Sequence, residues 1–542
     1  MEGRVSEGAW RNRYAPMLVL SAVAEPRSPP SWKGTQPQAV ATVEFTRLVH
    51  NAHVQQLRSV SMYVLGAASA WAAYNIVEVF AFSEGARIHR VETACLILAG
   101  AVVLRSIAGG VAADSVPSQP QRFWQLLAAA GAVVWLCGAG LQLSFPFLSD
   151  DYVFLATDLA EPATWEFYRP VFVNVMGLMT SRSAVLSPLP FHVASMTLHL
   201  TCAILAGTLF RRLVSRDGTA WLVGALVLLN PLQLESVLWV SGLQELLWSV
   251  FALGALTVYS SSIVVDAKRA LVTMALVGAA LGSKETAVAL ALLLPATDVA
   301  LGRSMRKQAP FYAAVLVCLG VYATVRANAV PAVEPRDVAI TSGYQLKEFL
   351  VAPYRRLLLP LSADVLEVPG LVRAVVGVTW VAIVTAVVWS GMGLRALGIG
   401  TAAILITTLP LQRYLFVSAS LEHARYLYWP AVGWACMCVG ALAPLAHYPV
   451  LHRIVGVVMV GVATGMLWAN LRPWSEAGEF VRVLTSEIAR GGQVESVVRR
   501  WRTEQGWPST ASDALPGSHK GVWLFLNGGD QFVALTRAGR LH

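Results

Sequence analysis

Two adjacent carboxylates, Asp150 and Asp151, stand directly after an apolar stretch of the chain, residues 123–145, that is long enough to cross a bilayer. Tyr168 and Arg169 follow before the next apolar stretch begins. Charged groups at the mouth of a membrane helix are costly to place there without a function. The sequence therefore predicts a loop at a membrane surface that carries an acid pair and an arginine, which suits chemistry on a charged lipid.

Other charged and aromatic side chains fall in loops or near span ends that the topology below places on the same membrane side. Ionisable residues near or within spans are functional candidates by default. We therefore expect a substrate-binding role for the following residues: Tyr168, Arg169, His199, Glu235, Glu245, Lys284, Glu285, Arg425 and Tyr426. Lys284 and Glu285 could instead form a local ion pair, and His199 could be a packing residue within its helix.

These residue types suit glycosyl transfer from a lipid phosphate. The acceptor hydroxyl must lose a proton to a nearby carboxylate, for which Asp150 and Asp151 are the candidates, with Asp150 favoured because it is nearer the span. Cations must stabilise the negative charge that grows on the departing phosphate, and Arg169, Lys284 and Arg425 are the candidates.

The elements that must position these residues are membrane helices. The chain has 542 residues, of which 56% are hydrophobic and only 13% are charged, about half the charged share of a soluble protein. Apolar runs recur from residue 59 to residue 470, which predicts an all-α polytopic membrane protein. We expect spans at residues 60–82, 92–112, 123–145, 193–213, 220–240, 243–264, 270–283, 285–300, 310–327, 371–390, 397–412, 428–447 and 453–471.

Basic residues fix the predicted orientation. A net charge of +9 reflects basic residues in an N-terminal arm, short loops and a tail, which is the positive-inside pattern and not a nucleic-acid signal. Both ends of segment 270–300 are basic, so both should be cytoplasmic, and the segment should turn back at Ser283-Lys284-Glu285. The candidate residues then face outside.

The predicted domain organisation has four parts. Residues 1–59 form a largely disordered cytoplasmic arm, residues 60–112 an extra transmembrane hairpin, residues 123–475 the core, and residues 476–542 a small extracytoplasmic tail. Residues 344–359 are amphipathic and should lie in the interface. Within the tail, residues 522–536 are typical of a β-hairpin. The six cysteines lie in apolar spans and show no disulfide or zinc spacing.

Several segments resemble the GT-C class of integral-membrane glycosyltransferases, and within it the transmembrane, tetratricopeptide-containing O-mannosyltransferases and their bacterial relatives. The resemblance covers residues 123–475 and is carried by Ser149 to Tyr152, Phe167 to Pro170, Phe191 to His199, Leu229 to Gly242 with Glu245 to Leu247, Gly282 to Val288 ending in Asp298, and Ala424 to Pro430. The chain departs from the family at Asn230-Pro231-Leu232-Gln233, where the family has His-Pro followed by a second His. It departs again at Leu243-Gln244, where the family has Arg-Lys.

The resemblance implies a GT-C-like bundle of about 11 core helices, in addition to the two N-terminal spans. It also implies an acidic motif, here Asp150 and Asp151, a polyprenyl-phosphate sugar donor, and inversion at the anomeric carbon. The acceptor would be a protein, polysaccharide or lipid hydroxyl at the outer face of a bacterial inner (plasma) membrane.

No cofactor is required by this chemistry, and a divalent cation held by Asp150 and Asp151 is compatible with it. Two other hypotheses remain open. One is a transporter or flippase of lipid-linked saccharide, and the other is a catalytically degenerate family member that acts as a binding or assembly partner.

Overall fold

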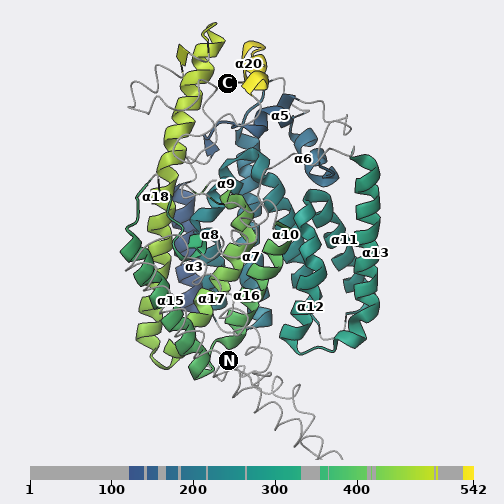
Figure 1. Cartoon of the computed structure of the whole chain (residues 1–542), viewed down its shortest axis with the longest axis vertical. Helices are drawn as coiled ribbons and strands as arrows, with labels where there is room; N and C mark the ends of the chain where they lie inside the picture. Colours follow the sequence, from purple (N-terminus) through teal and green to yellow (C-terminus); the bar gives the residue numbers. More distant parts are fainter. Residues whose placement is uncertain are drawn as a thin grey trace, which may run out of the picture. The chain divides into compact units, whose positions relative to one another are not determined.

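Helices make up the secondary structure of the part of the chain that the computed structural model describes (Figure 1). That part comprises residues 121–138, 143–156, 167–180, 185–214, 218–262, 265–330, 355–363, 365–411, 417, 421, 423–493, 496–497 and 529–541. The predicted all-α class is confirmed there. The predicted arm 1–59, the hairpin 60–112 and most of the interfacial helix 344–359 lie outside the described residues.

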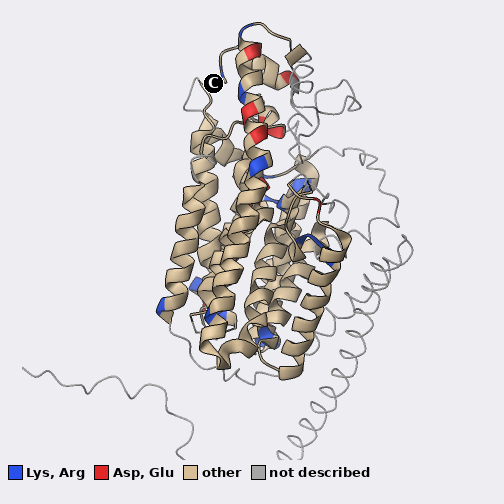
Figure 2. Ribbon diagram, turned by 90° about the vertical axis from the view of Figure 1, so that its left-hand side faces the viewer, with Lys and Arg blue, Asp and Glu red and all other residues tan. Residues whose placement is uncertain are grey.

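Seven helices among the described residues are long and apolar enough to cross a membrane. They are Leu189–Leu213 (α7), Val240–Tyr259 (η3, Val240–Gly242, with α10, Leu243–Tyr259), Met305–Ala329 (α13), Gly370–Ser390 (α15), Leu394–Leu411 (α16, Leu394–Thr408, with η5, Leu409–Leu411), Ala424–His447 (η6, Ala424–Leu427; α17, Tyr428–Ala441; η7, Ala443–His447) and Pro449–Ala489 (α18). Charged residues gather toward the two ends of these helices and leave a broad uncharged band between them (Figure 2). This distribution is typical of an integral membrane protein.

Shorter helices complete the bundle. These are α3 (Gln121–Cys137), α5 (Asp150–Ala156), α6 (Pro170–Thr180), α11 (Ala267–Ser283) and α12 (Leu290–Leu301). With 17 residues each, α3 and α11 fall just short of the ~20 residues that span a bilayer without help from their neighbours. The number of core spans therefore stays a prediction.

One predicted span, residues 220–240, is broken in the structure. It forms α8 (Ala220–Leu228), a single 3₁₀ turn η2 (Pro231–Gln233) and α9 (Leu234–Leu238), and the two halves are bent by 53°. Pro231 has no N–H to continue the helical ladder, and the Asn230 side chain accepts the N–H of Leu232 instead, at 3.0 Å. Glu235 lies on α9, just after the break, where it pairs with Arg425.

The predicted turn at Ser283-Lys284-Glu285 is also a break between helices. Helix α11 ends at Ser283, Lys284 takes an extended conformation, and the 3₁₀ helix η4 (Glu285–Ala289) leads into α12. In Figure 1, α11 and α12 lie on the same side of the bundle, and α12 runs down to the end opposite α5. Lys284 and Glu285 therefore stand at a chain break near the α5 end, as the charge pattern predicts.

Helix α18 continues far beyond the predicted span 453–471. It runs without a break to Ala489 and so crosses the boundary that the sequence placed at residue 475. Its 41 residues extend about 60 Å, twice the thickness of a hydrocarbon core. The predicted β-hairpin at 522–536 is wrong in its described part, because residues Gly529–Arg537 form a helix, α20. Its apolar side chains Phe532 and Leu535 are three residues apart and share a buried helical face, which outweighs the alternating pattern.

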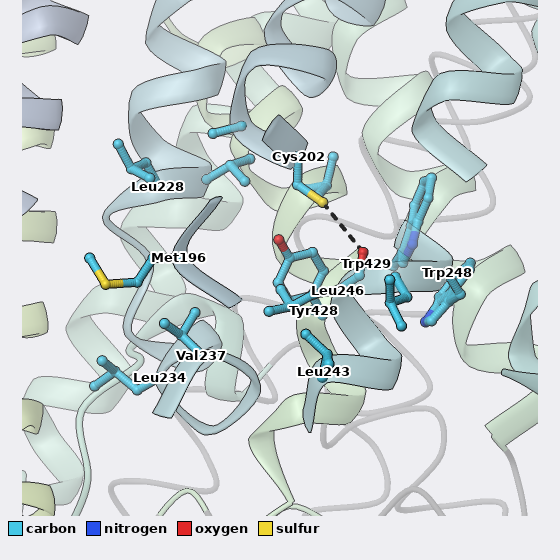
Figure 3. Packing of buried hydrophobic residues seen from close by; sticks show 14 of the residues in the cluster. Met196, Cys202, Leu228, Leu234, Val237, Leu243, Leu246, Trp248, Tyr428 and Trp429 are labelled. Carbon is cyan, nitrogen blue, oxygen red and sulfur yellow. Dashed lines mark hydrogen bonds between the residues drawn. The ribbon is translucent and has the colours of Figure 1, made fainter. Parts of the chain in front are cut away.

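The buried core lies where α7, α10 and α17 meet (Figure 3). Trp248 of α10 stacks on Trp429 of α17, with ring centroids 5.1 Å apart. Cys202 of α7 lies 4.0 Å from the Leu246 carbonyl oxygen of α10, with its thiol as donor. Large aromatic side chains thus fill the space between these helices and hold the α5 end of α10 against α17.

Helices α16 and α17 pack through glycine with almost no space between their backbones. Gly393 lies against Gly440, and Gly400 lies against Gly433, which makes the two helices antiparallel. A Cβ atom on Gly433 would lie 2.5 Å from the Gly400 carbonyl oxygen and 2.9 Å from Ile404. Small residues of this kind allow the close approach that drives helix association in lipid.

We predict that Gly433→Ala destabilises the protein by about 1–3 kcal/mol, because the added methyl forces α16 and α17 apart. The thermal melting midpoint of the full chain in detergent measures this effect. The matched control is Gly278→Ala in α11, where nothing lies within 4 Å of the added Cβ. The control should be neutral or slightly stabilising, because alanine favours helix more than glycine does. Equal midpoints for the two variants would contradict the close packing.

Candidate functional site

Asp151 anchors the short helix α5 to the rest of the protein. Its side chain is completely buried, and its carboxylate accepts three backbone N–H groups: Leu148 at 2.9 Å, Ser241 at 2.6 Å and Val240 at 3.3 Å. The last two belong to η3, so the carboxylate joins α5 to the start of α10. The Leu148 N–H lies in the same chain segment and fixes the start of α5, while the two η3 donors hold that segment against α10, so the carboxylate has a structural role.

Burial raises the pKa of Asp151 to about 8, against the opposing effect of the three backbone donors. A carboxyl group with this pKa holds a proton for much of the time near neutral pH, so it is a poor proton acceptor for an incoming hydroxyl. Asp150 is only partly buried, and its charge acts on the nearby guanidinium of Arg425. Of the two predicted acids, Asp150 is therefore better suited to work as a base.

Arg425 is held between an aromatic ring and a carboxylate. Its guanidinium lies 4.2 Å above the Trp239 ring, and its Nη1 is 3.1 Å from Glu235 Oε1. The backbone N–H of Arg425 also donates to Glu235 Oε2, at 3.1 Å. Trp239 in turn donates its indole N–H to the Leu148 carbonyl oxygen at 3.1 Å, just before the acid pair. These contacts fix a planar cation beside the start of α5.

Lys284 forms a buried ion pair with Glu245 of α10, not with its neighbour Glu285. Both side chains are about 95% buried. The second oxygen of Glu245 accepts the indole N–H of Trp248 at 2.5 Å, and the Lys284 ammonium lies 4.9 Å from the centre of the Tyr426 ring. A charge buried to this degree needs such a set of partners.

Arg169 forms the third ion pair, with Glu285. Its Nη2 and Nε lie 2.7 Å and 2.9 Å from Glu285 Oε2, and its Nη1 donates to the Gln244 side chain. The Phe167 ring covers the guanidinium at 4.0 Å. The two charged side chains are 10% and 23% exposed, which makes Glu285 the most accessible carboxylate of the three pairs.

The three ion pairs form one cluster. The charges of Arg169, Arg425, Glu285 and Glu235 all act on Lys284. Of the predicted site residues, the structure brings together the following: Asp150, Asp151, Arg169, Glu235, Glu245, Lys284, Glu285, Arg425 and Tyr426. We call this set the charge cluster. Tyr168 lies at its edge, where its carbonyl oxygen accepts the Tyr322 hydroxyl at 3.2 Å.

His199 lies apart from these ion pairs, in the helical core. One ring nitrogen is 2.9 Å from the Tyr428 hydroxyl, and the other is 3.2 Å from the Leu228 carbonyl oxygen. Both nitrogens are thus occupied by the protein, and the residue is buried. This environment fits the packing alternative that the sequence left open for His199.

Three residues other than glycine have a positive φ among those described, and all three lie next to the charge cluster. Ser149 (φ 45°) immediately precedes Asp150, while Leu421 (φ 64°) and His423 (φ 62°) closely precede Arg425. Left-handed backbone of this kind is costly without glycine and concentrates where side chains must be held in set positions.

Two further residues contact the charge cluster and were not predicted from the sequence. Trp239 lies under Arg425, and Gln244 binds Arg169. Trp239 follows Glu235 by four residues, a spacing that places the two together on one face of a helix, but the short helix α9 that carries this spacing was predicted as part of one long span. Gln244 occupies a position where the chain departs from the family pattern, so the resemblance gave no indication of its role.

No group of three or more potential His, Cys, Asp or Glu metal ligands occurs in the part of the chain described. Comparison of the whole chain with known proteins finds no matching family model, no matching curated protein and no matching solved structure. The charge cluster is therefore the feature of the protein that indicates its function.

We predict that Lys284→Met destabilises the protein by about 3–5 kcal/mol, because Glu245 is then left buried without its cation. The double variant Lys284→Met/Glu245→Gln removes both charges and should recover most of that loss. Melting midpoints of the single and double variants in detergent measure the coupling. If the double variant melts no higher than Lys284→Met, the two charges do not depend on each other.

Proposed function

We propose that this protein is a GT-C-type membrane glycosyltransferase. It transfers a sugar, of the hexose or mannose type, from a polyprenyl-phosphate donor to an acceptor hydroxyl at the outer face of a bacterial inner membrane. One observation carries the proposal: Asp150 is a partly buried carboxylate at the start of α5, and the Trp239 ring beneath the Arg425 guanidinium donates its N–H to Leu148, two residues before Asp150, at one end of a bundle of apolar helices. The transfer needs a base and a cation close together where a lipid-borne substrate can reach them.

The proposed reaction is a single displacement. Asp150 accepts the proton of the acceptor hydroxyl as its oxygen attacks the anomeric carbon of the sugar. The bond from that carbon to the phosphate oxygen breaks, the configuration inverts, and the polyprenyl phosphate leaves with the bonding electrons. Arg425 beside Asp150, and Arg169 and Lys284 further along the charge cluster, stabilise the negative charge on the departing phosphate.

The pairing of every cation in the charge cluster limits how the donor binds. Arg169, Lys284 and Arg425 each have a glutamate partner, so a phosphate must compete with a carboxylate for its hydrogen bonds. The Arg169–Glu285 pair is the most exposed and already uses a planar, two-pronged contact that a phosphate can copy. We therefore assign the donor phosphate to Arg169, with Glu285 as the carboxylate that it displaces.

We predict that Asp150→Asn lowers sugar transfer by about 100-fold or more, because the base is lost while the shape is kept. The measurement is transfer of labelled sugar from a panel of polyprenyl-phosphate hexoses to membrane acceptors. The control is Asp266→Asn, an exposed helix-capping residue at the opposite end of the bundle.

Comparison of wild-type protein with Asp150→Asn also separates the rival hypotheses. If wild-type protein moves labelled lipid-linked sugar across vesicle membranes and Asp150→Asn does so equally well, the protein is a transporter. If wild-type protein shows neither transfer nor transport, a binding or assembly role replaces the enzymatic one. Transfer that survives Asp150→Asn overturns the role of this carboxylate.

We predict that Glu285→Gln tightens the binding of polyprenyl phosphate by roughly threefold to tenfold, because it removes the competing charge from Arg169. Arg169→Gln should weaken the same binding by a similar or larger factor. Quenching of tryptophan fluorescence by added polyprenyl phosphate in detergent gives both affinities. Weaker binding by Glu285→Gln would show that this glutamate is not the displaced group.

A further inference from the structure

The C-terminal helix α20 packs directly on α5, the helix that begins with Asp150. The Phe532 ring of α20 lies 4.9 Å from the Tyr152 ring, and each residue is only 1% exposed. Figure 1 shows α20 beside α5 at the same end of the bundle. A segment that the sequence treats as a separate tail is thus part of the surroundings of the acid pair.

A second contact fixes the end of this segment. Leu541 forms an isolated parallel bridge with Leu186, whose N–H donates to the Arg540 carbonyl oxygen at 2.8 Å. Leu186 lies just before α7, and both leucines are buried. Helix α20 and the residues that follow it are therefore both held against the rest of the protein, the helix by apolar packing and the chain end by a backbone hydrogen bond.

The extension of α18 holds the chain just before the acid pair. The Trp474 ring lies 5.7 Å from the Phe145 ring in an edge-on arrangement, and a Cβ atom on Gly478 would lie 3.0 Å from the same ring. The Phe145 carbonyl oxygen is 2.7 Å from a ring nitrogen of His192. Residues 145–148 are thereby confined between α18 and α7.

Helix α5 needs these contacts because it is too short to be stable alone. It has seven residues, and isolated helices shorter than about 12 residues are marginal in water. Three of its side chains are buried: Asp151, Tyr152 and Leu155. Two of them contact other elements of the protein. Asp151 attaches α5 to η3, and Tyr152 attaches it to α20. Without the α20 support, the contact of Asp151 with η3 would be left as the main long-range attachment of α5.

We infer that the C-terminal part of α18 and helix α20 form a clamp that positions α5, and that Phe532 is its principal positioning residue. The clamp itself is a property of the structure. Its consequence for sugar transfer rests on the proposed function, because the chain leading into α5 is joined to Arg425 through Trp239, which binds Leu148 and lies under the guanidinium.

The test is hydrogen exchange of the full chain in detergent, in wild type, Phe532→Ala, Phe532→Leu and Arg537→Ala. Exchange at the amides of Asp151 to Ala156 should rise by about tenfold or more in Phe532→Ala, because a large buried side chain is removed from its support. Phe532→Leu keeps most of the apolar volume and should retain most of the protection. Arg537 is exposed on the same helix, and its replacement should change nothing.

In the transfer assay, Phe532→Ala should lower kcat by about tenfold while KM for the donor changes little, since Arg169 lies outside the clamp. Exchange in Phe532→Ala equal to that in Arg537→Ala overturns the clamp. Raised exchange with an unchanged kcat overturns the positioning of Asp150. Failure of the wild type to transfer sugar contradicts the proposed function alone, because the exchange result does not depend on any activity.

Discussion

Buried charge needs an opposite charge within reach, and this constraint governs the α5 end of the bundle. Lys284 and Glu245 are almost completely removed from solvent, and leaving either of them alone in an apolar surrounding would be strongly destabilising. The protein meets the requirement with three ion pairs that join five separate segments of the chain: Arg169 with Glu285, Lys284 with Glu245, and Arg425 with Glu235. Indole rings of Trp239 and Trp248 add further support, one beneath a guanidinium and one through an N–H donated to a carboxylate. The helices can come together at this end only if these partners meet.

Breaks in the helices are what allow the partners to meet. If α8 and α11 continued as regular helices, Glu235 and Lys284 would lie among the apolar side chains of the adjacent helices. Instead, Pro231 ends the ladder of α8, and the extended residue Lys284 separates α11 from η4. The charged side chains then project from short 3₁₀ and helical turns near the end of the bundle. Far from the charges, the glycine contact between α16 and α17 needs no such breaks and keeps both helices regular through their apolar parts. The helices are thus regular where they pack through apolar residues and irregular where the backbone must bring charged side chains together.

The sequence predicts those features that depend on local composition. Apolar runs predict the long helices α7, α13 and α15, and the basic ends of segment 270–300 predict the turn at Lys284. Long-range partners are not encoded locally, so the pairing of Lys284 with Glu245 and of Glu285 with Arg169 could not be read from the chain, where Lys284 and Glu285 stand side by side. The C-terminal residues 529–537 also have a structure that depends on a long-range contact. Residues 529–537 are compatible with a strand by composition, but packing of Phe532 against Tyr152 requires a helical face. Tertiary contact decides between the two.

The two aspartates that follow one another in the sequence have different environments, and this difference is the strongest chemical argument in the structure. Asp151 points into the protein, accepts three backbone N–H groups and has a raised pKa because it is buried. Asp150, one residue earlier on the same short helix, is partly exposed, and its charge acts on Arg425. If both residues served only to start a helix, either would suffice, and neither would need a guanidinium held over an indole ring nearby. A proton-accepting site needs a carboxylate that is held in place and still has oxygen atoms available for the substrate. Asp151 meets the first need by fixing the helix, so the oxygens of Asp150 need not be used to hold the helix in position.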